Sequence, residues 1–405
     1  MKRNRLLTAL GVLLTCIVLA SCGAQPGGQG QPKTIKVGAL YPLSGELAQI
    51  GDNVRNGLVL AVEDINAAGG IRSMGGAKIE LVFGDTQGKP DVGVSEVDRL
   101  VQQEGVVAII GCYQSAVTIP ATQEAERLQV PFIVDIAVAN KITERGFRWV
   151  FRVGPKADSY AADQVAFLKD LPSLGGPEIR KVALLHEDTD WGQSTAEAQK
   201  RFLKEAGIEV LAEVTYPANA ADLTTEVSKA AASNPDAILT VTYLNDAVLI
   251  TQAREKLGLK HILFMDTAGG TIDPEYIKRL GSAADGMLTV VEFSKFAKGS
   301  AELNERYRAR FGEDMTGNSV HSYQAGLVLA DALERAGTTE KNALRDAIAK
   351  TDMSGEKVVL PSGRVQFGED GQNKYARLYV VQIQNGELMP VWPAAVATAK
   401  IQFGQ

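Results

Sequence analysis

The segment Gly111-Cys-Tyr-Gln-Ser115 places polar side chains where an apolar run gives way to a helix expected to begin near residue 116. Ser115 suits the N-cap position of that helix, where backbone N–H groups lack partners within the helix. Those N–H groups and the helix dipole can hold a carboxylate, and Tyr113 and Gln114 stand beside them. The spacing therefore predicts an anion subsite at Ser115, or else a serine that only caps its own helix.

Two other expected strand ends in the first half of the chain carry candidate ligand-binding residues. Tyr41 and Ser44 follow a β-rich run, and Asp135 and Ala137 follow a short apolar run. Ligands of open α/β sheets bind outside the carboxyl ends of the strands. We therefore expect these four residues to lie near the same ligand as Ser115, with Asp135 as a charge near the cleft.

The second half of the chain offers a parallel set of candidates. Trp191 and Tyr243 each follow an apolar run, Asp266 lies at the end of another, and Phe293 lies where the chain is expected to cross between lobes. Aromatic side chains supply a large contact area at low entropic cost. Trp191 and Tyr243 therefore suit a wall that closes over a solute, and ordinary packing is the alternative for each aromatic residue.

The sequence contains no arrangement typical of catalysis or of metal binding. Neither H-E-x-x-H nor G-x-S-x-G occurs, and the three histidines, His186, His261 and His321, are far apart in sequence. The run Gly84–Pro90 differs from a phosphate-binding loop in its spacing and in its final proline. Cys112 has no obvious base nearby in sequence, which favours a buried structural thiol. We expect no cofactor, no metal and no enzymatic activity.

The composition is that of an ordinary soluble globular protein. Of the 405 residues, 45% are hydrophobic and 22% are charged, which excludes a disordered chain and a multi-span membrane protein. With 42 Lys and Arg against 48 Asp and Glu, the net charge of −6 argues against a nucleic-acid partner. The length suggests two domains.

The N-terminal residues resemble a bacterial lipoprotein signal. Three basic residues precede an apolar run over residues 6–20, which is shorter than the roughly 20 residues that a membrane span needs. Leu19-Ala-Ser-Cys22 resembles a lipobox, in which the cysteine becomes the lipidated first residue of the mature chain. We expect residues 1–21 to be a signal peptide, Cys22 to carry the lipid, and residues 22–32 to be a flexible tether. An ordinary secretory signal is the alternative.

Strands and helices alternate along the rest of the chain. Continuous apolar strands that alternate with helices are typical of parallel sheets covered on both faces. Because the alternation of strands and helices begins again at Val182, the pattern predicts an α/β fold with two doubly wound lobes. Short strands are expected after Lys357. The expected strands include 34–40, 79–83, 106–110, 131–134, 182–185, 237–241 and 262–265, and the expected helices include 54–67, 91–104 and 116–128.

Several motifs together resemble the branched-chain amino-acid-binding (Leu/Ile/Val-binding) family of ABC transporter substrate-binding proteins. They include Gly38-Ala-Leu-Tyr-Pro-Leu-Ser-Gly45, Val62-Glu-Asp-Ile-Asn-Ala-Ala-Gly-Gly-Ile71 and Phe83-Gly-Asp-Thr86. The resemblance implies a type I periplasmic-binding-protein fold, in which two lobes are joined by a three-strand hinge. It implies lobe 1 over residues 33–152 and 290–370, and lobe 2 over residues 153–289 and 371–395.

The resemblance also implies roles for individual residues. The family uses the position of Ser115 for the ligand carboxylate, and Ala137 can give the carbonyl that members usually supply nearby. The acid that members place at the position of Ala268, to neutralise an α-ammonium, is absent. A buried ammonium without a carboxylate costs several kcal/mol. Either Asp135 or Asp266 therefore replaces the missing acid, or the ligand has no ammonium.

The resemblance finally implies the partners of the protein, because family members hand a small extracellular solute to an ABC permease. We expect an extracytoplasmic receptor, anchored by lipid to a bacterial membrane in the periplasm or on the outer face of the cell, which acts as a monomer. The expected solute is amino-acid-like, and the alternative is an amide or an aromatic or aliphatic carboxylate. The alternative role is that of a ligand sensor for a separate signalling partner.

Overall fold

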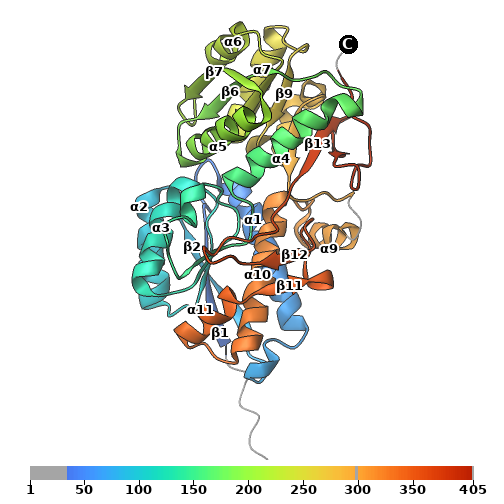
Figure 1. Ribbon diagram of the computed structural model, residues 1–405. Coiled ribbons are helices and arrows are strands. Elements are labelled where there is room, and N and C mark those ends of the chain that lie inside the picture. Colours follow the sequence, from blue (N-terminus) through green and yellow to red (C-terminus); the bar gives the residue numbers. More distant parts are fainter. Residues whose placement is uncertain (1–33, 297–299, 404–405) are drawn as a thin grey trace, which may run out of the picture.

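The computed structural model describes residues 34–296 and 300–403. The predicted signal peptide, Cys22 and the tether lie outside these residues. Figure 1 shows two lobes, each with a central sheet that is covered by helices on both faces. This architecture confirms the predicted α/β fold with two doubly wound lobes.

The first lobe is built on a five-stranded parallel sheet. Its strands, in spatial order, are β2 (Lys78–Asp85), β1 (Thr34–Tyr41), β3 (Ile109–Gly111), β4 (Phe132–Val134) and β5 (Val150–Arg152). Its helices are α1 (Ala48–Ala67), α2 (Pro90–Asp98), α3 (Ser115–Leu128), α9 (Ala301–Phe311), α10 (Gly317–Ala336) and α11 (Lys341–Ala349). α1 packs with α10, and α2 packs with α3 in a separate apolar cluster, so both faces of the buried central strands are covered. A separate two-stranded antiparallel sheet consists of β11 (Asp352–Ser354) and β12 (Arg364–Gln366).

The second lobe is built on a seven-stranded sheet. Its strands, in spatial order, are β14 (Glu387–Trp392), β13 (Tyr379–Gln384), β10 (Leu288–Val291), β9 (Leu263–Asp266), β8 (Ala237–Val241), β6 (Lys181–Glu187) and β7 (Glu209–Tyr216). The strands from β6 to β10 are parallel to their neighbours, whereas β13 pairs antiparallel with β10 and β14. Its helices are α4 (Ala157–Asp170), α5 (Asp190–Ala206), α6 (Thr224–Ala232), α7 (Leu244–Lys256) and α8 (Pro274–Leu280).

Both sheets have a topological switch point at the same place in their order. β1 lies between β2 and β3, and β6 lies between β7 and β8. Successive connections therefore leave β1 and β6 in opposite directions, which opens a crevice at the carboxyl ends of the strands. The fold places the loops after β1 and β3, and those after β6 and β8, where a ligand of this architecture is expected.

The chain passes between the two sheets three times, after β5, after β10 and after β12. The first and third crossings run side by side. The N–H of Arg152 donates to the carbonyl of Gly371 (2.9 Å), and the N–H of Asn373 donates to the carbonyl of Arg152 (2.9 Å). These bonds tie two hinge segments together although they are far apart in sequence.

The sequence predicted which residues of the strands and helices are buried more accurately than it predicted where these elements end. β3 is shorter than the predicted strand 106–110, although the N–H of Val107 still donates to the carbonyl of Lys36 in β1 (2.9 Å). The helix predicted over residues 91–104 ends as α2 at Asp98 and continues as the π-helical turn Arg99–Gln103. An apolar pattern indicates which residues are buried, and buried residues continue beyond the last backbone hydrogen bond of a strand or helix.

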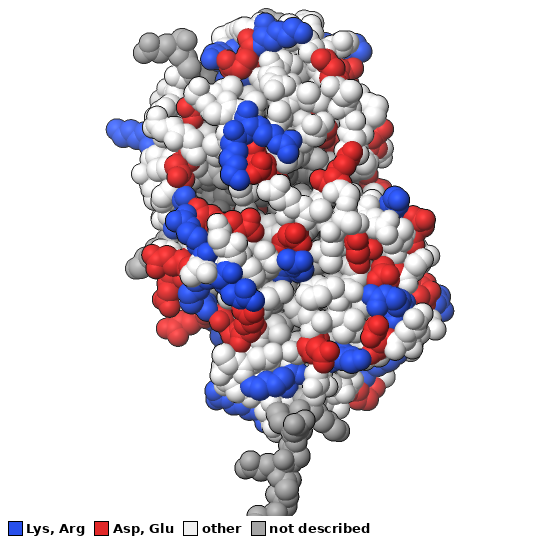
Figure 2. Space-filling view, turned by 180° about the vertical axis from the view of Figure 1, so that it is seen from behind, with Lys and Arg blue, Asp and Glu red and all other residues white. Residues whose placement is uncertain are grey.

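Charged side chains of both signs are interspersed over the surface. Figure 2 shows Lys and Arg beside Asp and Glu on this face of both lobes. Some pairs tie neighbouring helices, such as Arg306 with Asp64 (2.7 Å) and Arg310 with Glu63 (3.0 Å), which join α9 to α1. Among the described residues, no helix has the length and apolar character that crossing a membrane requires.

Close packing between α1 and α10 depends on two glycines. A Cβ placed on Gly57 would lie 2.0 Å from the carbonyl oxygen of Ser319, and one placed on Gly326 would lie 2.8 Å from the Cβ of Ala61. Neither helix backbone can approach the other this closely with a side chain in the way. The two glycines therefore set the distance at which α10 covers the sheet of the first lobe.

Substitution Gly57→Ala should destabilise the first lobe. The added methyl group meets backbone rather than a flexible side chain, so the overpacking cost of about 1–3 kcal/mol should exceed the gain in helix propensity of about 1 kcal/mol. Urea unfolding measures the change. The control Ala67→Ser, at the exposed end of the same helix, should change stability by less than about 0.5 kcal/mol. Equal stabilities for the two variants would contradict the close approach.

Candidate functional site

A cavity of about 30 Å³ lies between the two lobes. That volume has room for about two water molecules, so the lobes are closed around it and a larger solute enters only when its walls separate. Residues of both switch points contribute to the wall, as the topology requires. The cavity is lined by Tyr113, Ser115, Ile136, Val138, Tyr160, Trp191, Tyr243, Ala268, Gly269 and Asn318.

Ser115 lies on the cavity wall as the first residue of α3, and its side chain does not cap that helix. Gln114 takes the N-cap position, whereas the predicted cap was Ser115. The Ser115 Oγ accepts the N–H groups of Val138 (3.2 Å) and Ala139 (3.1 Å). These two bonds use the lone pairs of the oxygen and leave its hydrogen to be donated. Ser115 can therefore donate to an acceptor such as a carboxylate oxygen.

The loop that follows β4 is held in place by the buried guanidinium of Arg152. Arg152 donates to the carbonyl oxygens of Ala137 (3.0 Å) and Ala139 (2.8 Å), to Thr143 Oγ1 (3.1 Å) and to Gln372 Oε1 (2.6 Å). Burial lowers the pKa of Arg152 to about 9. The Ala137 carbonyl, which was predicted to meet the ligand, thus accepts a hydrogen bond from Arg152, and the neighbouring side chains of Ile136 and Val138 line the cavity.

An aromatic cluster forms the opposite wall. The ring of Trp191 lies 4.9 Å from that of Tyr243, edge to face, and Tyr243 lies 6.2 Å from Tyr113 of the first lobe. The start of α5 is fixed by the Glu187 carboxylate, which accepts the N–H of Gly192 (2.7 Å). Trp191 Nε1 is buried and has no hydrogen-bond partner among the described residues. The cluster supplies apolar contact and one free donor.

The two predicted counter-ions, Asp135 and Asp266, have partners inside the protein, and neither lines the cavity. Asp135 accepts the hydroxyl of Tyr41 (2.6 Å) and the N–H of Ile136 (3.0 Å). Burial raises the pKa of Asp135 and that of Asp266 to about 7. The Asp266 carboxylate accepts three hydroxyl groups, from Thr240 (2.8 Å), Thr242 (3.0 Å) and Thr271 (2.8 Å).

Three further predicted residues lie outside the central cavity. Ser44 and Gln114 line an adjacent cavity of about 280 Å³ that shares Tyr243 with it. Gln114 Oε1 is buried there and has no partner among the described residues. Phe293 lines a third pocket, of about 240 Å³, at the hinge. The structure thus gathers Tyr113, Ser115, Trp191 and Tyr243 around one cavity and distributes the other predicted residues around it.

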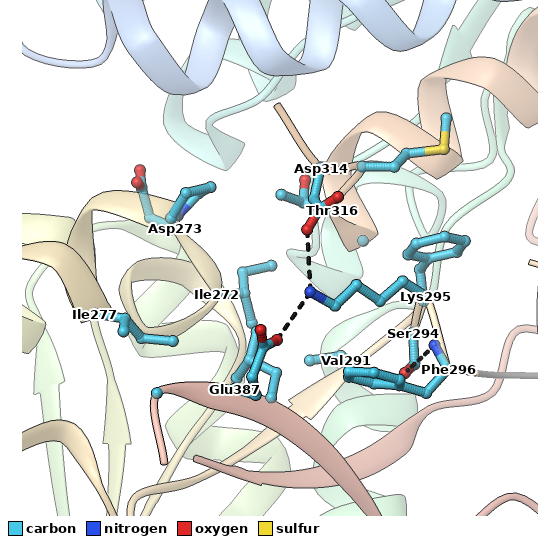
Figure 3. A pocket seen from close by; sticks show the side chains of 16 residues that line it. Ile272, Asp273, Ile277, Val291, Ser294, Lys295, Phe296, Asp314, Thr316 and Glu387 are labelled. Atoms are coloured by element: carbon cyan, nitrogen blue, oxygen red, sulfur yellow. Dashed lines mark hydrogen bonds and ion pairs between the residues drawn. The ribbon is translucent and has the colours of Figure 1, made fainter. Parts of the chain in front are cut away.

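The hinge pocket contains a lysine that bridges the two lobes. Figure 3 shows Lys295 Nζ between Asp314 (3.1 Å) and Glu387 (2.8 Å). Asp314 precedes α10 of the first lobe, and Glu387 begins β14 of the second. Because Lys295 itself lies on the crossing after β10, the three charges connect both lobes to the hinge.

Two residues at or near the cavity were not predicted from the sequence. Asn318 lies in the first turn of α10, and its Nδ2 is buried without a partner among the described residues. Glu292 immediately precedes Phe293, is 2% exposed, and has an unpartnered Oε2 within the described chain. No local pattern marks Glu292, because it is a bend residue just after β10 rather than part of a strand.

The residues set aside in the sequence are consistent with structural roles. Cys112 is buried, and burial raises the pKa of its thiol, which opposes thiolate formation. Burial lowers the pKa of His321 to about 3, so this imidazole stays neutral. Within the ranges that the structure describes, no group of three or more His, Cys, Asp and Glu residues is placed to hold a metal ion.

Comparison with known families matches residues 34–387 to the family described as "Periplasmic binding protein". The "Leu/Ile/Val-binding protein homolog 7" of Brucella abortus is 32% identical over 399 residues, which cover 96% of this chain and 99% of that protein. The chain belongs to the periplasmic binding protein family. This membership implies an extracytoplasmic location and the fold that the motifs predicted.

Solved structures of other periplasmic binding proteins share the fold. The branched-chain amino acid transporter substrate binding protein of Streptococcus pneumoniae, in complex with isoleucine, has a TM-score of 0.75 at 25% identity, covering 88% of this chain and 98% of that chain. An ABC transporter solute binding protein of R. palustris, in complex with benzoate, has a TM-score of 0.78 at 21% identity, covering 90% and 98%. Proteins of this fold thus hold ligands with and without an amine.

Substitution Lys295→Met should favour the open arrangement of the lobes. Each partly exposed ion pair contributes about 0.5 kcal/mol, so losing both, about 1 kcal/mol together, should shift the open–closed equilibrium roughly fivefold. Small-angle X-ray scattering of the solute-free protein measures the change, which should disappear at high salt because the ion pairs are then screened. The control Lys278→Met breaks a pair with Glu275 inside α8. Identical scattering from the two variants would exclude a bridging role.

Proposed function

We propose that this periplasmic binding protein captures a small amino-acid-like solute between its two lobes and delivers it to an ABC permease. The observation that carries the proposal is the composition of the cavity wall. Ser115, Trp191 and Asn318 line one small space whose other walls are aromatic and aliphatic, and each has a donor, an O–H or an N–H, without an acceptor among the described residues. Such a wall suits a solute with a carboxylate and an apolar body.

Closure of the lobes supplies the coupling between binding and delivery. Ser115 belongs to the first lobe and Trp191 to the second, so a solute touches both only when they come together. A ligand shifts such an equilibrium by its difference in affinity for the two states. A permease that recognises the closed arrangement would then select the loaded protein.

An aromatic or aliphatic carboxylate without an amine is the second candidate. It is supported by the aromatic cluster of Trp191, Tyr243 and Tyr113 and by the fold shared with the benzoate-bound protein. The Leu/Ile/Val-binding name of the Brucella relative supports the amino-acid candidate. Both candidates place a carboxylate at Ser115, so they differ only in what meets the rest of the cavity.

Substitution Ser115→Ala should weaken solute binding about 10- to 100-fold, because it removes a charge-assisted hydrogen bond worth about 1.5–3 kcal/mol. Isothermal titration with L-leucine and L-isoleucine, on protein unfolded and refolded to release bound solute, measures the change. Trp191→Phe, which keeps an aromatic ring but removes the indole N–H, should weaken binding by a smaller factor. The control Ser173→Ala, at an exposed position, should bind as the parent does. Undiminished binding by Ser115→Ala would contradict the carboxylate subsite.

We further propose that the mature protein begins at Cys22 and is held at the membrane by lipid. The proposal is supported by the basic region, the apolar run and the lipobox-like Leu19-Ala-Ser-Cys22, together with the extracytoplasmic location that the family implies. Two or more acyl chains suffice for stable anchoring. The tether of residues 22–32 would let the lobes reach the permease.

Substitution Cys22→Ala should release the protein from the membrane. Without the cysteine no lipid can be attached, so the chain should lose incorporation of labelled palmitate and move from the detergent phase to the aqueous phase. The control Cys112→Ala changes a buried thiol and should leave both measurements unchanged. Palmitate incorporation that survives in Cys22→Ala would exclude this residue as the lipid site.

A further inference from the structure

Glu292 is a buried acid with one carboxylate oxygen that has no partner in the described part of the chain. It follows β10 on the crossing to α9, it is 2% exposed, and its Oε2 has no hydrogen-bond partner among the described residues. An isolated carboxylate is expensive to bury unless it is neutralised or paired. Burial accordingly raises the pKa of Glu292 to about 8. An unsatisfied group at this cost requires an explanation.

The position of the Glu292 side chain is known from the residues around it. Val291 and Phe293 both line the hinge pocket of Figure 3, whereas Glu292 between them does not. A Cβ placed on Gly317 would lie 2.3 Å from Glu292 Oε2, so the carboxylate lies against the first residue of α10. The next residue, Asn318, lines the central cavity.

Two further observations place Glu292 near the central cavity. Burial raises the pKa of Tyr113, a residue of the cavity wall, and the charges of Asp273, Glu292 and Asp266 add to this shift. The Nδ2 of Asn318, beside it, is also buried without a partner in the described chain. An acid with an unpartnered oxygen therefore lies next to a residue of the cavity wall that has an unpartnered donor, whereas Asp135 and Asp266 are satisfied by hydroxyl and N–H groups of the protein.

We propose that Glu292 is the counter-ion for a protonated amine of the bound solute, so that the site selects zwitterions over amine-free acids. The inference rests on the proposed amino-acid-like ligand and specifies which residue recognises its amine. The solute carboxylate takes the donors of Ser115, Trp191 and Asn318, and the ammonium takes the Glu292 carboxylate. An amine-free acid fills the first set of contacts but leaves Glu292 unpaired.

Matched pairs of probes test the inference without relying on a variant. The pairs are L-leucine with 4-methylpentanoate, and L-phenylalanine with 3-phenylpropanoate, which differ only by the amine. Isothermal titration of the purified protein, freed of bound solute, should show the amine-bearing member of a binding pair at least 100-fold tighter. Glu292→Gln should reduce that ratio to less than tenfold and leave the affinity for the amine-free acid equal or improved.

A matched control and a stability measurement make the outcomes separable. Asp266→Asn changes a buried acid that already has three hydroxyl partners, and it should keep the amine preference. Glu292→Gln should unfold at the same temperature as the parent or higher, because it removes an unpaired buried acid. Amine-free acids that bind the parent as tightly as amino acids, or a full preference retained by Glu292→Gln, would overturn the role of Glu292 and leave the receptor function standing. Failure of every probe to bind would count against the amino-acid-like ligand and the inference that rests on it.

Discussion

The buried guanidinium of Arg152 is the interaction on which the binding site depends. A cation without a bonded carboxylate must be stabilised by dipoles, and Arg152 is surrounded by neutral oxygens from the loop after β4 and from Gln372 of the third crossing. The carbonyls of Ala137 and Ala139 turn toward this charge. The N–H groups of Val138 and Ala139 are then available to Ser115 Oγ. One buried charge thus links the hinge, the loop and the ligand-facing hydroxyl.

The hinge contributes to recognition as well as to movement. Glu292 and Lys295 lie three residues apart on one crossing and have different surroundings: the acid lies against the first residue of α10, and the lysine lies in the hinge pocket between two acids. A solute that contacts both lobes and the crossing is held by three parts of the chain that converge only on closure. Its binding free energy is therefore expressed mainly in the closed state, which is the condition for a population shift.

The topological rule accounts for what the sequence predicted well. Tyr113, Ser115, Trp191 and Tyr243 all follow strands beside a switch point, so the alternation of apolar runs and helices was enough to bring them to one cavity. Asp135 follows β4 and Asp266 ends β9, but side-chain partners decide whether a strand-end acid faces a ligand. The hydroxyls that satisfy Asp266 come from Thr240, Thr242 and Thr271, a pairing that depends on register between strands.

Glu292 and Asn318 were not predicted from the sequence for a different reason. Neither lies at the end of a strand beside a switch point: Asn318 is in the first turn of α10, and Glu292 is on an irregular crossing after β10. The direction of a side chain there depends on how the crossing meets α10, which is a tertiary property. Local pattern identifies the strand, and only packing decides on which side of the crossing the acid lies.

The alanine at position 268 fits a cavity whose acid comes from the crossing. Ala268, at the position where the resembled family places its acid, lines the cavity. This part of the cavity wall therefore carries no charge. Two carboxylates on one small, buried wall would repel each other and raise the pKa of both, and one ammonium cannot neutralise two charges. Glu292 and Ala268 are therefore a consistent pair, in which moving the acid to the hinge brings recognition of the amine onto the segment that must bend when the lobes close.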